Sequence, residues 1–318
     1  MEKGYSYSQI GKALDRNPSG IWYEVTHHKV RNVYNAKKAT HKAYVARHDS
    51  KYQAMKVVEN PDLRAFVEWE LYHDQSPENI AGRIKTHERH LPPISKESIY
   101  RYLKSVYGRR IEYLRTRKKA RHRRRRTQTK KLTDRTFIDK RPVSINKRMR
   151  IGHAEADFIV SGDGGTGIML TVVDRKIRIA FLELILKVTI DAVHQAFLRI
   201  KKRYPELCTF TTDNDILFRH HQELARLLGV KIYFCHPYHS WEKGSIENVN
   251  GVVRRTIPKG SDLSRCSRQF VRALERKLND RFMKCLGYRT PFEVLRKARK
   301  QKKPRERRRV RQQGRHLN

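Results

Sequence analysis

Three acidic residues, Asp157, Asp213 and Glu247, have the types and positions needed for metal-assisted chemistry. Each lies where a predicted strand or helix would point a carboxylate toward one shared site, and 33 residues separate Asp213 from Glu247. Hard divalent cations prefer oxygen ligands. Two such ions can activate a nucleophile and hold the leaving oxygen of a phosphodiester. The trio therefore predicts cation-dependent cleavage of a nucleic-acid backbone.

The composition favours a polyanionic partner. The 318-residue chain contains 72 Lys and Arg residues against 32 Asp and Glu residues, a formal net charge of +40. A charge of that size indicates nucleic acid. No run of about 18 apolar residues predicts a membrane span, and the N-terminus has no apolar signal core, so we expect no membrane association.

The cysteines indicate a reduced protein. Cys208, Cys235, Cys266 and Cys285 are widely spaced and form no CxxC pair. This spacing predicts neither a structural zinc site nor a disulfide framework. It favours an intracellular protein.

Two tracts, residues 115–126 and 296–309, are dense in Lys and Arg. Such tracts are typical of solvated linkers and tails, and their charge attracts DNA phosphates whether or not they are ordered. We therefore expect a basic linker and a basic tail.

The first 50 residues predict two short helices joined by a tight turn. Apolar residues at helical spacing around Ile10 mark the first helix, and Asn17 followed by Pro18 marks the start of the second. This pattern is typical of a helix-turn-helix, although an ordinary helical hairpin has the same pattern. The residues expected to lead the second helix into the major groove are Ser19, Gly20, Trp22 and Tyr23.

Residues 60–105 predict a second pair of helices. One begins at Ser76 and Pro77, and the other, Lys96 to Lys104, is capped by Ser95. The pair is either a second helix-turn-helix or a helical spacer.

From about Arg150 the pattern changes to alternating strands and helices. The predicted strands are 155–160, 168–173, 178–185, 209–212 and 231–235, and the predicted helices are 191–204, 218–228 and 245–256. Three antiparallel strands followed by this alternation predict an α/β fold with an RNase H-like, integrase-type mixed five-stranded sheet and flanking helices. In this order the first and fourth strands are neighbours, so Asp157 and Asp213 lie close together and the last helix brings Glu247 over both.

Other acidic residues occur near the trio. We expect them at the surface or in turns, with Glu155 and Asp215 the first substitutes if a member of the trio is wrong. These residues are Glu155, Asp163, Asp174, Asp215 and Glu242.

The segments around the trio resemble those of bacterial DDE transposases of the insertion sequence 30 family. They are GHAEADFIV (152–160), TFTTDNDILF (209–218) and YHSWEKGSIENVNGVVRRTIPKGSDLS (238–264). The glutamate of the family motif falls on Glu247. Three upstream segments are also similar to the family: SPENIAGRI (76–84), ISKESIYRYL (94–103) and RPVSINKR (141–148).

The resemblance implies an enzyme that binds double-stranded DNA. It implies recognition of terminal inverted repeats, followed by strand cleavage and transfer of the freed 3′-hydroxyl to target DNA. It further implies two Mg²⁺ or Mn²⁺ ions held by Asp157, Asp213 and Glu247. By analogy we expect a homo-oligomer, a dimer or larger, in the bacterial cytoplasm and associated with the nucleoid.

The third motif adds candidate DNA contacts. These are Lys243, Asn248, Asn250, Arg254 and Arg255. Helix capping and an ordinary helix surface are the alternative interpretation.

The chain departs from the family pattern at several positions. Ala154 and Ala156 stand where Trp and Gly are usual, and Leu217 stands where Glu is common. Asp215 replaces a Gly, which predicts strain if the backbone there needs a positive φ. The first domain also starts late for the family, at Met1, and is expected to be truncated at its N-terminus.

These departures motivate a second hypothesis, a catalytically impaired transposase remnant that acts only as a sequence-specific DNA-binding protein or repressor. A third, a ribonuclease of similar fold, leaves the helix-turn-helix without a role.

The predicted division has five parts. They are a helix-turn-helix domain (1–50), a second helical module (51–112), a basic linker (113–149), an RNase H-like catalytic domain (150–295) and a basic C-terminal tail (296–318).

Overall fold

The computed structural model describes residues 4–29, 32–50, 55–116, 134–162, 164–237 and 239–301. Most of the first basic tract and the second tract beyond residue 301 lie outside these residues. Within the described part, no helix has the length and apolar character needed to cross a bilayer.

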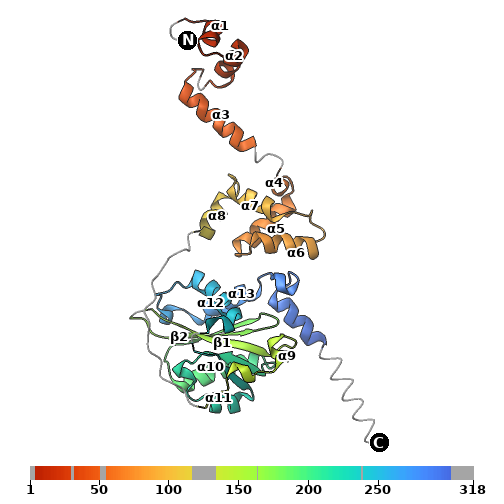
Figure 1. The fold of residues 1–318 in the computed structure, drawn as a ribbon, viewed down its shortest axis with the longest axis vertical. Helices are drawn as coiled ribbons and strands as arrows, with labels where there is room; N and C mark the ends of the chain where they lie inside the picture. Colours follow the sequence, from red (N-terminus) through yellow and green to blue (C-terminus); the bar gives the residue numbers. More distant parts are fainter. Residues whose placement is uncertain are drawn as a thin grey trace, which may run out of the picture.

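A five-stranded mixed sheet forms the centre of the larger domain (Figure 1). Its strands are β1 (His153–Val160), β2 (Ile168–Asp174), β3 (Ala180–Ile185), β4 (Thr209–Thr212) and β5 (Lys231–Phe234). The strand order is β3-β2-β1-β4-β5. The first three strands are antiparallel, and β4 runs parallel to both β1 and β5. The predicted RNase H-like order, with the first and fourth strands adjacent, is confirmed.

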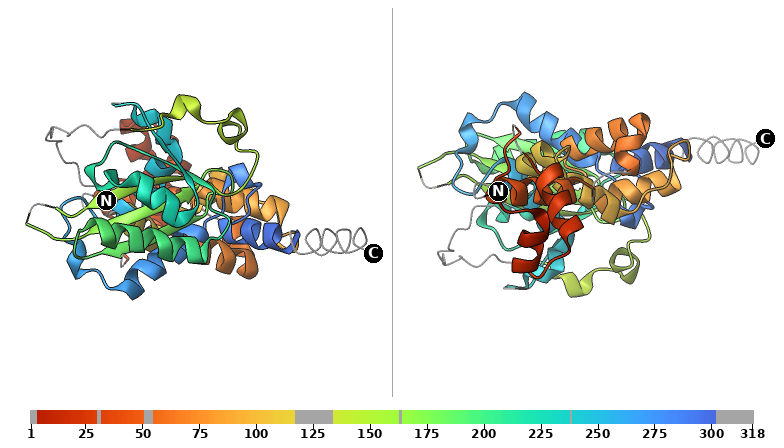
Figure 2. Two further views of the ribbon diagram at one scale, coloured as in Figure 1. Left: turned by 90° about the horizontal axis from the view of Figure 1, so that it is seen from below. Right: turned by 90° about the horizontal axis from the view of Figure 1, so that it is seen from above.

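Helices cover both faces of the sheet (Figures 1 and 2). Helices α10 (Ile190–Arg203) and α11 (His221–Leu228) pack on the face that carries Ala154 and Ala156. Helices α12 (Gly244–Thr256) and α13 (Arg268–Asn279) pack on the face that carries Ile159. Because side chains alternate along a strand, Glu155 and Asp157 point to the α12 side.

Helix α11 starts later than predicted. A 3₁₀ turn, η2 (Ile216–Phe218), precedes it, and Asp215 caps that turn by accepting a hydrogen bond from the Leu217 amide at 2.9 Å. At the other end, Gly229 adopts φ 61°, a left-handed conformation that favours glycine. The helix therefore stops where the sequence predicted.

A separate helical module has its own apolar core. Its helices are α4 (Lys56–Glu59), α5 (Pro61–Tyr72), α6 (Pro77–Thr86), α7 (Lys96–Lys104) and α8 (Arg109–Thr116). The Ser76 and Ser95 side chains cap α6 and α7 as predicted. Helix α5 was missed, although Asn60 before Pro61 is a cap signal and its buried Leu63, Val67 and Leu71 have helical spacing.

This module docks on the segment that follows α13. Arg83 forms a two-pronged ion pair with Glu293, at 2.9 and 2.8 Å. The Asn79 side chain donates to the Phe282 carbonyl at 2.7 Å. A Cβ at Gly82 would lie 2.1 Å from the Tyr288 ring, so the ring can reach the helix backbone only because residue 82 is glycine.

The N-terminal region contains α1 (Tyr7–Ala13), α2 (Pro18–His27) and α3 (Ala36–Ser50). The predicted cap is confirmed, since the Asn17 side chain accepts from the Ser19 amide at 2.9 Å. The turn between α1 and α2 is tight: a Cβ at Gly11 would lie 2.6 Å from the Arg16 carbonyl oxygen. The two helices therefore have the close turn predicted for a helix-turn-helix.

Parts of the predicted linker and tail are packed against the catalytic domain. Phe137 bridges Phe234 of β5, and the buried Arg141 guanidinium donates to Thr211 Oγ1 at 2.9 Å. Residues 296–301 continue a helix, in which Arg299 pairs with Glu206 at 2.8 Å. Residues 134–149 and 296–301, predicted as parts of the linker and the tail, therefore contact the catalytic domain, and the charge density of these segments does not report such contacts.

Candidate active site

The Asp157 carboxylate is held by two side chains from the α12 side of the sheet. The Lys243 ammonium lies 3.2 Å from Oδ1, and the Asn250 amide donates to Oδ2 at 2.7 Å. Lys243 directly precedes α12 and Asn250 lies in its second turn. Side chains from just before α12 and from its second turn therefore point at β1.

Asp213 follows β4 and so lies beside β1. Its Oδ2 is 3.3 Å from the same Lys243 ammonium, which therefore bridges the two aspartates. Asp213 Oδ1 is buried and forms no hydrogen bond with any residue that the structure describes. One carboxylate oxygen at the centre of the site is thus available for a further ligand.

Glu247 lies on the same face of α12. It is four residues after Lys243 and three before Asn250, the spacing of neighbours on a helix surface. Its side chain is exposed and has no ion pair or hydrogen bond within the described part of the chain. The structure brings Asp157 and Asp213 together around Lys243 and leaves Glu247 on the exposed surface of α12.

The trio does not converge on one point in this structure: among the described residues, its oxygens are not a group within 4.8 Å of one another. Two ions about 3.5–4 Å apart, each bound at about 2.1 Å, allow the outer two ligands to lie up to about 8 Å apart. A two-ion site therefore does not require the three carboxylates to converge on one point.

The site is short of positive charge. Burial raises the pKa of Asp157, and the attraction of Lys243 only partly opposes it. Burial also disfavours the ammonium, but the charges of Asp213 and Asp157 outweigh it and raise the pKa of Lys243. The Lys243 ammonium thus stays charged, but its single positive charge does not neutralise the two carboxylates of Asp157 and Asp213. Added cations would neutralise the remaining negative charge.

Glu155, predicted at the surface or in a turn, lies within β1 and is 1% exposed. It pairs with the buried Arg175 at 3.0 Å and accepts hydrogen bonds from the Ser245 and Ile246 amides at 3.0 and 2.9 Å. These amides are at the start of α12, where helix N–H groups have no partner within the helix. Glu155 is therefore a structural residue that fixes the helix N-terminus, and it is not a substitute for the trio.

Asp174, predicted at the surface or in a turn, ends β2 at a turn, where its carboxylate accepts hydrogen bonds from the Lys176 and Ile177 amides, both at 2.8 Å. It is buried and also accepts hydrogen bonds from the Gly152 amide and the Tyr204 hydroxyl, both at 2.7 Å. Asp215 has φ −66°, so the strain expected where it replaces Gly is absent. Its carboxylate caps η2. Asp163 lies outside the described residues.

The residues predicted to read DNA from α2 are exposed. Trp22 and Tyr23 are 50% and 55% exposed, and Ser19 and Gly20 are also at the surface. The Tyr23 ring stacks on His27 with 4.1 Å between ring centres. The helix therefore presents a free aromatic and polar face.

The candidate DNA contacts on α12 divide between different environments. Lys243 and Asn250 are engaged with Asp157. Arg254 donates to the Val160 carbonyl at 3.0 Å, and burial lowers its pKa. Arg255 is exposed and borders a groove next to α13.

Asn248 lines a cavity of about 380 Å³ between α12, the helical module and the segment after α13. None of its lining residues is acidic. The basic residues in the lining are Arg148, Arg178, Arg281 and Lys284. The Arg178 guanidinium hydrogen-bonds to Ser245 Oγ at the start of α12. The basic lining of this cavity is suited to a phosphate group.

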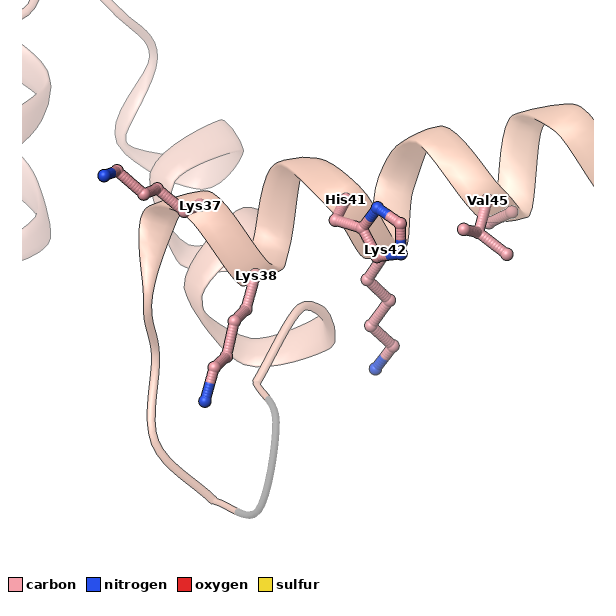
Figure 3. A pocket seen from close by; sticks show the side chains of 6 residues that line it. Lys37, Lys38, His41, Lys42 and Val45 are labelled. Carbon is pink, nitrogen blue, oxygen red and sulfur yellow. The ribbon is translucent and has the colours of Figure 1, made fainter.

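A basic surface on α3 was missed. Lys37, Lys38, His41 and Lys42 lie along it, and Figure 3 shows their side chains directed away from the helix axis. Lys42 also donates to the His27 carbonyl at the end of α2, at 3.0 Å. The signal in the sequence is the spacing of these basic residues, which gathers them on one side of a helix.

Two aspartates on adjacent strands are linked by an ammonium and lie on the sheet face covered by a glutamate-bearing helix. This is the arrangement that the sequence predicted for an enzyme of the DDE nuclease and transferase class. No family model matches the chain. Among solved structures, the chain is similar to the catalytic core domain of BIV integrase, at 19% identity and a TM-score of 0.36, over 48% of this chain and 97% of that chain.

Curated relatives identify the family. The transposase for insertion sequence element IS4351 of Bacteroides fragilis is 36% identical over 75% of this chain and 74% of its own length. The transposase InsI for insertion sequence element IS30A of Escherichia coli (strain K12) is 32% identical over 91% of this chain and 78% of its own length. The chain belongs to the IS30 family of transposases, and its function is in DNA transposition.

Proposed function

We propose that this transposase binds the terminal inverted repeats of its insertion element, cleaves a DNA strand there and joins the freed end to target DNA, using two Mg²⁺ or Mn²⁺ ions. The observation that carries the proposal is the Lys243 ammonium between Asp157 and Asp213. It occupies a position where a cation is favoured by two carboxylates, one of which keeps an unpartnered oxygen.

The residues present fit such ions. Asp157 and Asp213 would hold the ions and Glu247 would complete the second site, and all three supply the oxygen donors that Mg²⁺ and Mn²⁺ prefer. When bound, the ions would activate the attacking water or 3′-hydroxyl and stabilise the leaving oxygen.

The other residues of the site position these ligands. Asn250 orients the Asp157 carboxylate through its amide. Glu155 fixes the first turn of α12 through two backbone amides and so sets the direction of Glu247. On binding of the ions Lys243 would leave the carboxylates and turn to a DNA phosphate, which agrees with its predicted role as a DNA contact.

We propose that DNA contacts extend over all the folded parts. The exposed face of α2 would read the inverted repeat, with Ser19, Gly20, Trp22 and Tyr23 nearest the bases. The cavity beside Asn248 and the exposed Arg255 would bind phosphates near the cleaved strand. We further propose the five-part division given above, revised so that residues 134–149 and 296–301 belong to the catalytic domain.

The protein is proposed to act as a dimer or larger assembly, since two element ends must be held together. Its DNA substrate would place it in the bacterial cytoplasm, on the nucleoid.

A strand-nicking assay on DNA that carries the inverted repeats tests the proposal. We expect cleavage in Mg²⁺ or Mn²⁺, lost in Asp213→Asn while DNA binding is retained. Binding without cleavage in either metal would instead support the repressor hypothesis, and preferred cleavage of an RNA–DNA hybrid would support a ribonuclease. As an independent check of DNA binding, log K should fall steeply with log salt concentration.

A further inference from the structure

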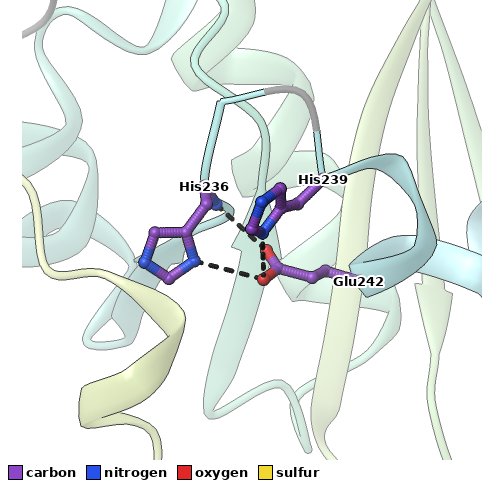
Figure 4. A group of neighbouring side chains, drawn as sticks. All are labelled: His236, His239 and Glu242. Atoms are coloured by element: carbon purple, nitrogen blue, oxygen red, sulfur yellow. Dashed lines mark hydrogen bonds and ion pairs between the residues drawn. The ribbon is translucent and has the colours of Figure 1, made fainter.

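Two histidines and a glutamate form a compact cluster next to the catalytic site. Cys235 separates His236 from the end of β5. His239 and Glu242 come three and six residues after His236, just before α12 begins (Figure 4). One donor atom from each lies within 4.8 Å of the other two. The proposed function assigns no role to any of the three.

The spacing of the donor atoms matches a tetrahedral metal site. Glu242 Oε1 is 3.1 Å from His236 Nδ1 and 3.3 Å from His239 Nδ1. Ligands at the corners of a tetrahedron are about 3.3 Å apart when the bonds to zinc are about 2.0–2.1 Å. The second oxygen, Oε2, accepts the His236 amide at 3.0 Å, so Oε1 is the oxygen left facing the imidazoles.

The His236 ring is fixed by groups outside the cluster. Its Nε2 lies 2.8 Å from Asp139 Oδ2, and its face stacks on Phe137 with 5.3 Å between ring centres. A histidine that binds a metal through one nitrogen commonly donates the other N–H to a carboxylate, which sets the tautomer and the ring orientation. Asp139 has the position of such an outer partner, and it comes from a different part of the chain.

We propose that His236, His239 and Glu242 bind a transition-metal ion of the Zn²⁺ class, separate from the catalytic ions. Two imidazole nitrogens and one carboxylate are a donor set that zinc uses and Mg²⁺ does not. Three protein ligands leave one tetrahedral position for water. The sequence-based expectation of no structural zinc site considered only the cysteines.

The bound ion would clamp the loop that precedes Lys243. It joins the end of β5 to the start of α12, and through Asp139 it reaches the segment before β1. This role does not depend on the proposed DNA cleavage, since it concerns the folded state of the loop.

Zinc binding by the full-length, untagged chain tests the proposal. The parent is the Asp157→Asn, Asp213→Asn double variant, which removes the catalytic carboxylates as competing ligands. After dialysis against Zn²⁺, we expect one tightly bound equivalent by elemental analysis and titration calorimetry. Co²⁺ in the same protein should give the absorption bands of a tetrahedral site.

Substitutions in the parent locate the ion. His239→Gln removes a half-exposed ligand and should weaken Zn²⁺ binding at least tenfold, and Asp139→Asn should weaken it about 10–100-fold as an outer partner. The matched control is His220→Gln, because His220 lies 3.5 Å from Glu223 in an exposed pair that belongs to no group of three metal-binding side chains among the described residues. Absence of a bound equivalent in the parent, or equal affinity in the parent and His239→Gln, would overturn the proposal.

Discussion

Glu155 and Asp157 lie two residues apart on β1 and face the same helix, but the groups that hold their carboxylates differ. The buried Glu155 carboxylate accepts hydrogen bonds from the Arg175 guanidinium and from two backbone amides, and these donors are part of the folded core. Asp157 is 23% exposed at its side chain and is held by the Asn250 amide and the Lys243 ammonium, with Asp213 and its unpartnered oxygen beside it. The contrast indicates that burial alone does not identify a catalytic carboxylate. The decisive feature is whether its partners can be exchanged.

The largest expected effect is a loss of strand cleavage when Asp157 is substituted. Asp157→Asn should lower the rate of strand cleavage by about 10³-fold, since metal assistance supplies several kcal/mol and about 1.4 kcal/mol corresponds to tenfold. Single-turnover cleavage of an inverted-repeat substrate measures it. Asp215→Asn, which alters a neighbouring carboxylate that only caps η2, should cost less than about tenfold. Equal losses in the two variants would remove the distinction.

A substitution at Glu155 should lower the stability of the folded protein. Glu155→Gln leaves Arg175 buried without its counter-charge, so the free energy of unfolding should fall by about 3–5 kcal/mol. Urea unfolding followed by circular dichroism measures it. In the same assay Asp157→Asn should change stability by less than about 1 kcal/mol, because its site is partly open to solvent. A stable Glu155→Gln variant would contradict the structural role of Glu155.

Lys243 distinguishes the two sites most directly, because the proposed function requires its ammonium to leave Asp157, whereas Arg175 stays paired with Glu155. Lys243→Met should tighten Mn²⁺ binding about three- to tenfold, near 1 kcal/mol, while cleavage falls because a phosphate contact is lost. Titration calorimetry measures the affinity, with the exposed Lys231→Met as control. Unchanged or weaker Mn²⁺ binding would show that the ammonium does not compete with the metal.

The smallest effect is expected where the helical module meets the catalytic domain. Arg83 and Glu293 are partly exposed, so their coupling in a double-mutant cycle should be about 1 kcal/mol. Burial raises the pKa of Glu293, but hydrogen bonds from Arg83 and Thr290 bring it below the ordinary value. The Arg83–Glu293 coupling should therefore be fully present at pH values above the ordinary pKa of a glutamate. It should be lost as the pH falls through the lowered pKa of Glu293. A coupling that persists in acid would exclude the ion pair as its source.

Local patterns predicted the secondary structure around the site well. The strands were placed to within two residues because apolar alternation and turn residues act locally. Asn17, Ser76 and Ser95 identified helix starts because a cap needs only its own neighbours. The pairing of β1 with β4 followed from the element order, and with it the proximity of Asp157 and Asp213.

The partners of buried charges could not be predicted in this way. Glu155 is held by Arg175 and by the start of α12, which lie 20 and about 90 residues away in the chain. Nothing in the segment around Glu155 reports them. The sequence alone also left open that Lys243 pairs with both aspartates, since it was identified only as a DNA contact. By contrast, the His236, His239 and Glu242 spacing was visible in the sequence and was overlooked.

The most direct test of the catalytic site is a crystal structure of the protein with its inverted-repeat DNA and Mn²⁺, with the anomalous signal of manganese recorded. We expect two peaks about 4 Å apart, bounded by the carboxylates of Asp157, Asp213 and Glu247, with the Lys243 ammonium displaced toward a phosphate. Manganese peaks away from Asp157 and Asp213, or a Glu247 side chain turned from both ions, would contradict the assignment.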